Sequence, residues 1–107
     1  MTDALVVLVT APAEQKAVEI ARALVDERLA ACVNVLSGVR SIYRWKGEVC
    51  EDPEVLLVVK TTAARFEALR SRVLALHPYE TPEVIALPVE AGSEPYLRWI
   101  VAESAPG

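Results

Sequence analysis

Two long β-prone segments that meet at one tight turn constrain the fold of this chain more than any other feature. They span residues 32–45 and 48–60, and Lys46 and Gly47 between them suit a two-residue hairpin turn, because glycine readily takes a positive φ. Each arm holds about 13 residues and can reach about 40 Å at about 3.3 Å per residue. We expect a bend at Gly38 in the first arm, and an edge or bulge at Pro53, which cannot donate to a ladder, in the second.

Hydrophobic periodicity predicts the elements on either side of this hairpin. Residues 4–9 form a continuous apolar run, which is typical of a central strand buried on both faces. Residues 13–31 and 66–76 place apolar side chains at helical spacing, and Thr61 and Thr62 suit the cap of the second helix. The remaining expected elements are a strand at 84–87 and a short helix at 94–103.

The resulting order, β-α-β-β-α-β followed by a short helix, predicts an α+β fold. It fits two split β-α-β halves, the ferredoxin-like sandwich, in which the helices lie on one face of an antiparallel sheet. A chain of 107 residues is the size of one domain, here residues 1–107. A domain of this size buries enough surface to fold without disulfides or a structural metal.

Composition limits the partners and the compartment. The net charge of −4 and the pI near 5.0 favour no nucleic-acid partner, which normally needs a basic face. No apolar run approaches the roughly 20 residues of a membrane span, and the first residues lack the basic region of a signal peptide. We therefore expect a cytoplasmic protein with no membrane partner. One Asn, one Gln and seven Pro suit a thermostable protein.

The hairpin should overhang the body of the domain. Helices of about 18 residues span only about 27 Å at about 1.5 Å per residue, less than the reach of the arms. A two-stranded ribbon is marginal in water, and a neighbouring subunit that pairs with its edge or covers its face would stabilise it. The alternative is that the C-terminal segment folds back over it. Its distal part carries large apolar side chains: Val39, Ile42, Tyr43, Trp45 and Val49.

The cysteines and the histidine define no standard site within one chain. The hairpin register places Cys50 opposite Tyr43 and Cys32 near Thr61, so the two thiols lie too far apart for a disulfide. A closed zinc site requires four ligands, and one chain offers only the two cysteines and His77 at unsuitable spacing. No phosphate-binding glycine loop or nucleophile elbow is present, so we expect no enzyme.

The densest polar cluster runs from His77 to Glu83, with two prolines that hold a short loop rigid. One interpretation is a helix stop, in which His77 interacts with the last carbonyls of its helix. The other is a binding role, in which His77 and Glu80 ligate a metal such as Cu(II) or Zn(II).

Other polar and aromatic residues also have two interpretations. Lys60 either extends its ammonium past the end of its strand, or faces an acid such as Glu54 or an anion in a cleft. Trp45, Tyr96 and Trp99 serve either core packing or ligand stacking.

Several short motifs occur in one order and together are highly specific. Over essentially the whole chain they resemble the CutA divalent-ion tolerance family. The resemblance implies a ferredoxin-like homotrimer similar to PII signalling proteins, with long hairpins wrapped around neighbouring subunits. The motifs are Ala31-Cys32-Val33-Asn34, Ser41-x-Tyr43-x-Trp45-x-Gly47, Lys60-Thr61, His77-Pro78-Tyr79-Glu80-x-Pro82-Glu83 and Tyr96-Leu97-x-Trp99.

The resemblance also implies a role in tolerance of copper and other divalent cations, with no obligatory cofactor and no catalytic residue. Some relatives carry a Cys and a second His where this chain has Val9 and Leu76, which weakens a copper site that depends on those groups. The candidate metal contacts are His77 and Glu80. The candidate residues of intersubunit clefts are Tyr43, Trp45, Glu54, Lys60, Tyr79 and Trp99.

Three functional hypotheses follow. The first is a cytoplasmic homotrimer for divalent-cation tolerance, which binds Cu(II) or another divalent metal through His77 and nearby carboxylates. The second is a PII-like sensor that binds a small anionic metabolite through Lys60. The third is a purely structural trimeric module without a small ligand.

Overall fold

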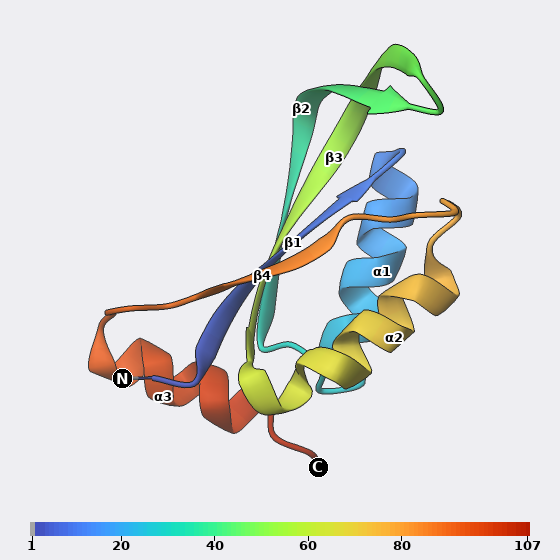
Figure 1. The fold of residues 1–107 in the computed structure, drawn as a ribbon. Helices are drawn as coiled ribbons and strands as arrows, with labels where there is room; N and C mark the ends of the chain where they lie inside the picture. The colour runs from blue at the N-terminus through green and yellow to red at the C-terminus, as the bar shows by residue number, and fades with distance from the viewer. Residues whose placement is uncertain (1) are drawn as a thin grey trace.

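The computed structural model describes residues 2–107, and Met1 of the expected domain lies outside the described residues. Four strands form one antiparallel sheet in the order β2-β3-β1-β4, as expected for the ferredoxin-like fold (Figure 1). The elements in chain order are β1 (Ala4–Ala11), α1 (Glu14–Asp26), β2 (Cys32–Trp45), β3 (Glu48–Thr62), a 3₁₀ turn (Ala63–Arg65), α2 (Phe66–Leu76), β4 (Val84–Pro88) and α3 (Glu94–Glu103).

The core lies between one face of the sheet and the two longer helices. Alternate residues of the central strands, such as Val7 and Leu57, point toward α1 and α2 and are fully buried. Ile20 of α1 and Leu69 of α2 meet them from the other side. This one-sided packing follows from the period of two along each strand.

The opposite face of the sheet is largely uncovered. We call it the open sheet face; it comprises Val6, Leu8, Leu56, Val58, Ile85 and Leu87. Leu8 pairs with Ile85, and Val6 pairs with Leu87. Ile85 is 52% exposed and Leu87 is 50% exposed, and α3 covers only one end of this face, where Ile100 packs on Ala4. The expectation that the first strand is buried on both faces is therefore wrong for a single chain.

The hairpin turn forms where the sequence predicts it. Lys46 has a φ of 50° and Gly47 a φ of 82°. Two positive φ values in a two-residue loop are typical of a type I′ turn, whose twist matches that of the strands. Trp45 and Glu48 close the ladder beneath it, and Tyr43 lies opposite Cys50 as expected.

A bulge in β2 changes the register nearer the body. The pairing shifts between Leu36 and Val39, where Gly38 has a φ of 87°, so the predicted bend is confirmed. The bulge inserts one extra residue and moves Cys32 opposite Lys60 rather than Thr61. Both cysteines are free thiols.

The hairpin extends past the helices further than the sequence suggested. α1 has 13 residues and ends before residue 31, where the sequence pattern placed its end. α2 has 11 residues, whereas the two arms of the hairpin have 14 and 15. Ile42 and Val49 near the tip are each 66% exposed. The C-terminal helix α3 lies at the other end of the sheet, so the alternative in which it covers the hairpin is wrong (Figure 1).

The start of α2 also differs from expectation. Neither Thr61 nor Thr62 caps the helix through its side chain. Thr61 is fully buried, and its hydroxyl donates 2.7 Å to the carbonyl of Leu29. The threonine therefore ties β3 to the loop after α1.

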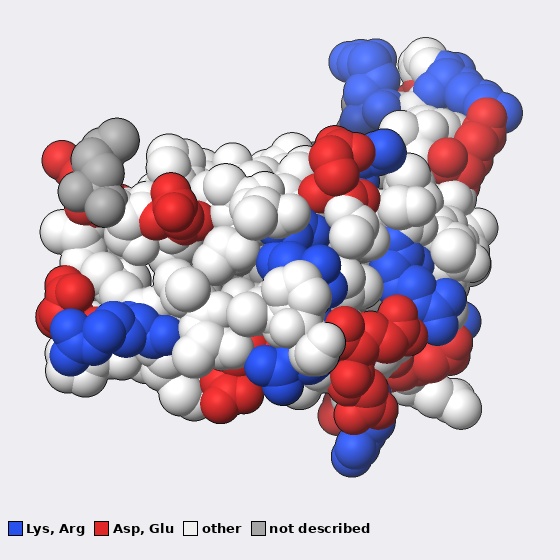
Figure 2. Space-filling view, turned by 90° about the horizontal axis from the view of Figure 1, so that it is seen from below, with Lys and Arg blue, Asp and Glu red and all other residues white. Residues whose placement is uncertain are grey.

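Charges are mixed on the surface. Figure 2 shows one face on which Lys and Arg lie among Asp and Glu, with uncharged groups between them. This face presents no continuous basic stripe of the kind that binds nucleic acid. Among residues 2–107, no helix has the length and apolarity to cross a membrane.

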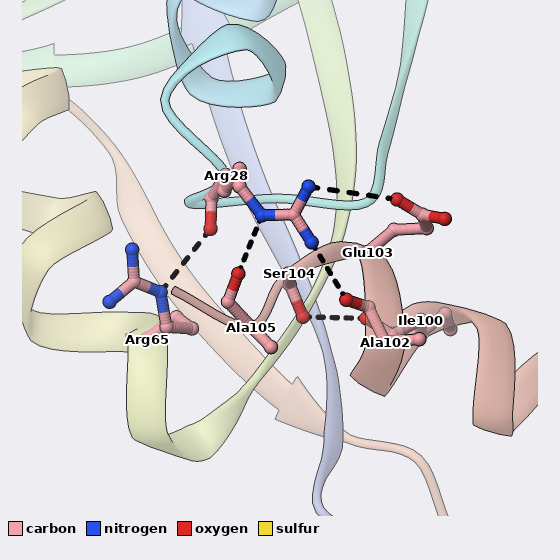
Figure 3. Close-up of polar contacts among 7 residues, drawn as sticks. All are labelled: Arg28, Arg65, Ile100, Ala102, Glu103, Ser104 and Ala105. Carbon is pink, nitrogen blue, oxygen red and sulfur yellow. Dashed lines mark hydrogen bonds and ion pairs between the residues drawn. The ribbon is translucent and has the colours of Figure 1, made fainter. Parts of the chain in front are cut away.

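Arg28 fastens the C-terminal segment to the body (Figure 3). It adopts the left-handed conformation, with a φ of 59°, which ends α1 early. Its Nε donates 2.7 Å to the carbonyl of Ala105, and its Nη2 donates 3.0 Å to that of Ala102. Its own carbonyl accepts 3.2 Å from Nε of Arg65, so one residue links the loop after α1, the 3₁₀ turn before α2 and the end of α3.

We expect Arg28→Ala to lower the free energy of unfolding by about 1–3 kcal/mol, because two carbonyls lose a charged donor. Urea unfolding followed by circular dichroism measures the change. Arg22→Ala, an exposed arginine on α1, is the matched control and should stay within about 0.5 kcal/mol of wild type. Equal stability of both variants would contradict the role assigned to Arg28.

Candidate functional site

A cleft of about 620 Å³ lies where the hairpin leaves the body of the domain. We call it the acidic cleft, because every charged residue in its wall is a carboxylate: Glu54, Glu80 and Glu83. It is built by β2, β3, the end of β1 and the loop after α2. Its remaining lining residues are Thr10, Ser41, Ile42, Tyr43, Trp45, Pro78, Tyr79 and Thr81.

Tyr43 forms one fixed phenol–carboxylate pair at the cleft. Its hydroxyl donates 2.5 Å to Oδ2 of Asp52. Ser41 is the direct partner of Asp52, so Tyr43 and Asp52 are diagonal neighbours on one face of the ribbon. The hydrogen bond to Asp52, with its negative charge, raises the pKa of Tyr43 to about 12.

Tyr79 forms the second pair and ties the loop after α2 to the hairpin. Its hydroxyl donates 2.7 Å to Oε2 of Glu54 on β3. Partial burial and the Glu54 carboxylate raise the pKa of Tyr79 above its usual value. Within one chain Lys60 bonds to Asn34 instead, so the interpretation in which it faces Glu54 does not apply to the single chain.

His77 anchors the same loop from beneath. Its Nε2 lies 2.7 Å from the carbonyl oxygen of Thr10 on β1, and its Nδ1 accepts 3.2 Å from the backbone N–H of Tyr79. These partners require the proton on Nε2, which donates to Thr10. His77 is 8% exposed and is not part of the cleft wall, and its ring lies tilted against that of Tyr79, with centroids 4.6 Å apart. His77 also ends α2, as the helix-stop interpretation expects: its backbone N–H donates 2.9 Å to the carbonyl of Val73, while its ring bonds to β1.

The two candidate metal contacts therefore occupy different positions. Glu80 lines the acidic cleft, whereas both ring nitrogens of His77 are already hydrogen-bonded. Among residues 2–107, no three His, Cys, Asp or Glu side chains come close enough to hold one metal ion. A chelating site would need groups from more than one chain.

Lys60 and Trp99, the other cleft candidates, lie elsewhere. The ammonium of Lys60 donates to Oδ1 of Asn34, its diagonal neighbour on β2. Trp99 is on α3 and stacks on Tyr96, with ring centroids 5.6 Å apart. The structure thus brings Tyr43, Trp45, Glu54, Tyr79 and Glu80 together and leaves Lys60 and Trp99 out.

A family model described as CutA1 divalent ion tolerance protein matches residues 5–103. The chain belongs to the CutA1 divalent ion tolerance family. The divalent-cation tolerance protein CutA of Thermus thermophilus is 59% identical over 95 residues, which are 89% of this chain and 92% of that protein. Protein CutA of mouse is 55% identical over 92 residues; these are 86% of this chain but only 52% of the mouse protein.

Solved structures of CutA proteins share the whole fold. The Thermus thermophilus protein superposes with a TM-score of 0.94 at 55% identity, covering 95% of this chain and 99% of that one. A PII-like protein CutA from Nostoc gives a TM-score of 0.89 at 38% identity, covering 96% and 99%. The CutA fold expected from the motifs is confirmed.

Sequence reasoning missed part of this CutA cleft. Thr10, Ser41, Ile42, Thr81 and Glu83 line it without having been singled out as cleft residues, and Asp52 fixes Tyr43. The hairpin register alone would have found Asp52, because it places this residue diagonally across from Tyr43. No local pattern indicates that the end of β1 joins the wall.

We expect Asp52→Asn to lower the pKa of Tyr43 toward its ordinary value of about 10, because the amide still accepts the hydrogen bond but carries no charge. Absorbance at 295 nm as a function of pH follows tyrosine ionisation. Glu51→Gln is the control, since Glu51 pairs with Arg40 instead.

The sign of the pH effect on stability follows from the same pair. The pKa of Tyr43 is raised in the folded state. The stabilisation of the folded state by the Tyr43–Asp52 hydrogen bond is therefore fully present below about pH 10 and is lost as the pH rises toward 12. The Asp52→Asn variant should lose less folding stability over this alkaline range. Identical titration curves for wild type and Asp52→Asn would contradict the coupling.

Proposed function

We propose that this chain forms a homotrimer that acts in divalent-cation tolerance and binds a divalent cation at clefts shared between subunits. The acidic cleft is the observation that carries the proposal. Its wall contains three glutamates and no Lys, Arg or His among the described residues. A site of this charge attracts cations and disfavours anions.

Two apolar surfaces of one chain support self-assembly. They are the open sheet face and the distal hairpin, and they lie on different parts of the molecule. Neighbouring copies can cover both, which is the usual remedy for exposed apolar surface. The number of subunits, three, is inferred from the CutA resemblance and agrees with the PII-like description of the Nostoc protein.

Carboxylate oxygens are the proposed metal ligands. We assign the contact to Glu80 with neighbouring glutamates. Because one chain supplies too few groups within reach, we propose that a second chain completes the set. Oxygen donors of this kind suit hard divalent cations such as Mn(II), whereas imidazole suits Cu(II) and Zn(II). His77 would have to give up a hydrogen bond to join, so we propose that it holds the loop in place.

The other hypotheses have less support. A small anionic metabolite would meet only carboxylates in the cleft, and the one lysine proposed to bind it, Lys60, lies outside the cleft wall. A purely structural module leaves the gathering of Glu54, Glu80 and Glu83 without a role. We keep the cytoplasm as the proposed compartment, although the Arabidopsis relative is described as chloroplastic and an Archaeoglobus structure as periplasmic.

Assembly is tested by light scattering after size exclusion at about 10 µM. A trimer of 11.7 kDa chains has a mass of about 35 kDa. Leu87→Glu should dissociate it, because a charge would be buried on the open sheet face. Leu74→Glu on α2, where the leucine is similarly exposed, should stay trimeric. A monomeric wild-type protein would refute the assembly.

Metal binding is tested by calorimetry on chelator-treated protein with Mn(II), Zn(II) and Cu(II). We expect Glu80→Gln to weaken binding about tenfold or more, since a ligand charge is lost, and His77→Ala to weaken it less. Glu90→Gln, an exposed glutamate outside the cleft wall, is the control. Equally weak binding by all four proteins would remove the metal proposal and favour a structural module.

A further inference from the structure

His77 is the only histidine of the chain and, among residues 2–107, the only buried side chain that is ionisable. Histidine is the side-chain type that ordinarily changes its charge between about pH 5 and 8. The contacts of this ring lie within one chain, on β1 and on the loop after α2, so they do not depend on how neighbouring subunits cover the hairpin. A change of charge at His77 therefore acts directly on that loop.

Both hydrogen bonds of the ring fix its neutral form. Nδ1 accepts 3.2 Å from the backbone N–H of Tyr79, a group that can only donate. Nε2 lies 2.7 Å from the carbonyl oxygen of Thr10, a group that can only accept. The loop after α2 thus closes on a ring that carries one proton, on Nε2, and keeps a lone pair on Nδ1.

A second proton would occupy that lone pair. The new N–H bond forms between a proton from solvent and Nδ1, and the hydrogen bond from the Tyr79 N–H is lost. Two N–H groups then face each other beside a residue that is 8% exposed, and a buried donor without an acceptor is destabilising. The bond to Thr10 survives, because Nε2 still donates. Protonation therefore opposes the contact of the ring with the loop and spares its contact with β1.

The groups that contact His77 carry no charge. β1 presents the carbonyl of Thr10, and α2 presents the carbonyl of Val73, which accepts from the backbone N–H of His77. The loop presents the ring of Tyr79, whose phenol donates to Glu54 and stays protonated in the acidic range. No carboxylate within residues 2–107 forms an ion pair with the imidazole.

Negative charge lies beyond these contacts. Glu54 accepts from the phenol of Tyr79, and Glu80 and Glu83 follow along the loop. The last turn of α2 contains no basic residue, so the negative end of its dipole is not offset there. These groups favour uptake of a proton by the ring. None of them replaces the acceptor that the N–H of Tyr79 loses.

We propose that His77 is a proton-operated latch, in which uptake of a proton at Nδ1 under mildly acidic conditions releases residues 78–83 from the body of the domain. Tyr79 is the link, because its N–H meets the imidazole and its phenol meets Glu54 on β3. Displacement of its backbone weakens both attachments of the loop. The latch needs neither a metal ion nor a second chain, so it is independent of the proposed metal site.

The single histidine makes the latch directly measurable by NMR. Long-range ¹H–¹⁵N spectra of the imidazole report which nitrogen carries a proton, and hydrogen exchange of the Tyr79 amide reports its hydrogen bond. Both are followed from about pH 7.5 to about pH 5 in metal-free buffer at constant ionic strength, with exchange rates corrected for their intrinsic pH dependence. The backbone amide of His77, which donates to Val73, is the internal control for an intact α2.

We expect the Nε2–H form of the ring at the upper end of this range. Protection of the Tyr79 amide should fall about tenfold as the ring takes up its proton, with the same midpoint, while the His77 amide stays protected. His77→Gln keeps a donor for Thr10 but takes up no proton, so protection of Tyr79 should then be independent of pH. Tyr79→Phe removes the bond to Glu54 and should enlarge the fall. Backbone spectra verify that each variant is folded.

Four results would overturn the latch. They are a ring protonated only on Nδ1 at the upper pH, a ring that stays neutral down to about pH 5, a ring that takes up its proton while the Tyr79 amide stays protected, and an equal fall of protection in His77→Gln. Because no metal enters the experiment, failure of the latch leaves the metal proposal untouched, and loss of metal binding leaves the latch untouched.

Discussion

One-sided packing of the antiparallel sheet is the constraint on which the rest of this structure depends. Val7, Leu57 and their neighbours on one face are sealed against α1 and α2, and the alternation along each strand places Leu8 and Ile85 on the other face. The helices stop at 13 and 11 residues while the hairpin arms run to 14 and 15. Both the open sheet face and the hairpin thus need cover that one chain does not supply.

The acidic cleft exists because two long-range contacts hold the loop after α2 against the hairpin. The neutral imidazole of His77 bonds to Thr10 on β1, and the phenol of Tyr79 bonds to Glu54 on β3. Two prolines restrict the loop between them. The histidine that the sequence offers as a ligand therefore acts as a support, and the glutamates beside it form the wall.

The sequence predicted the element order, the turn at Lys46 and Gly47 and the bend at Gly38, because each depends on local pattern or on glycine. It could not predict the early end of α1, because the Schellman motif that closes this helix has Arg28, not the usual glycine, in the left-handed position. Within one chain Tyr79 lines the cleft and Lys60 does not, because a period of two gives the face of a strand but not the position along a molecule 44 Å long.

Metal binding at the acidic cleft depends on how freely the carboxylates can move. A small divalent ion demands close approach of several oxygens and must shed strongly bound water. Asp52 and Glu54 are each held by a phenol, which fixes their position and occupies part of their acceptor capacity. A divalent ion proposed for the cleft thus depends on the ligands that a neighbouring subunit adds.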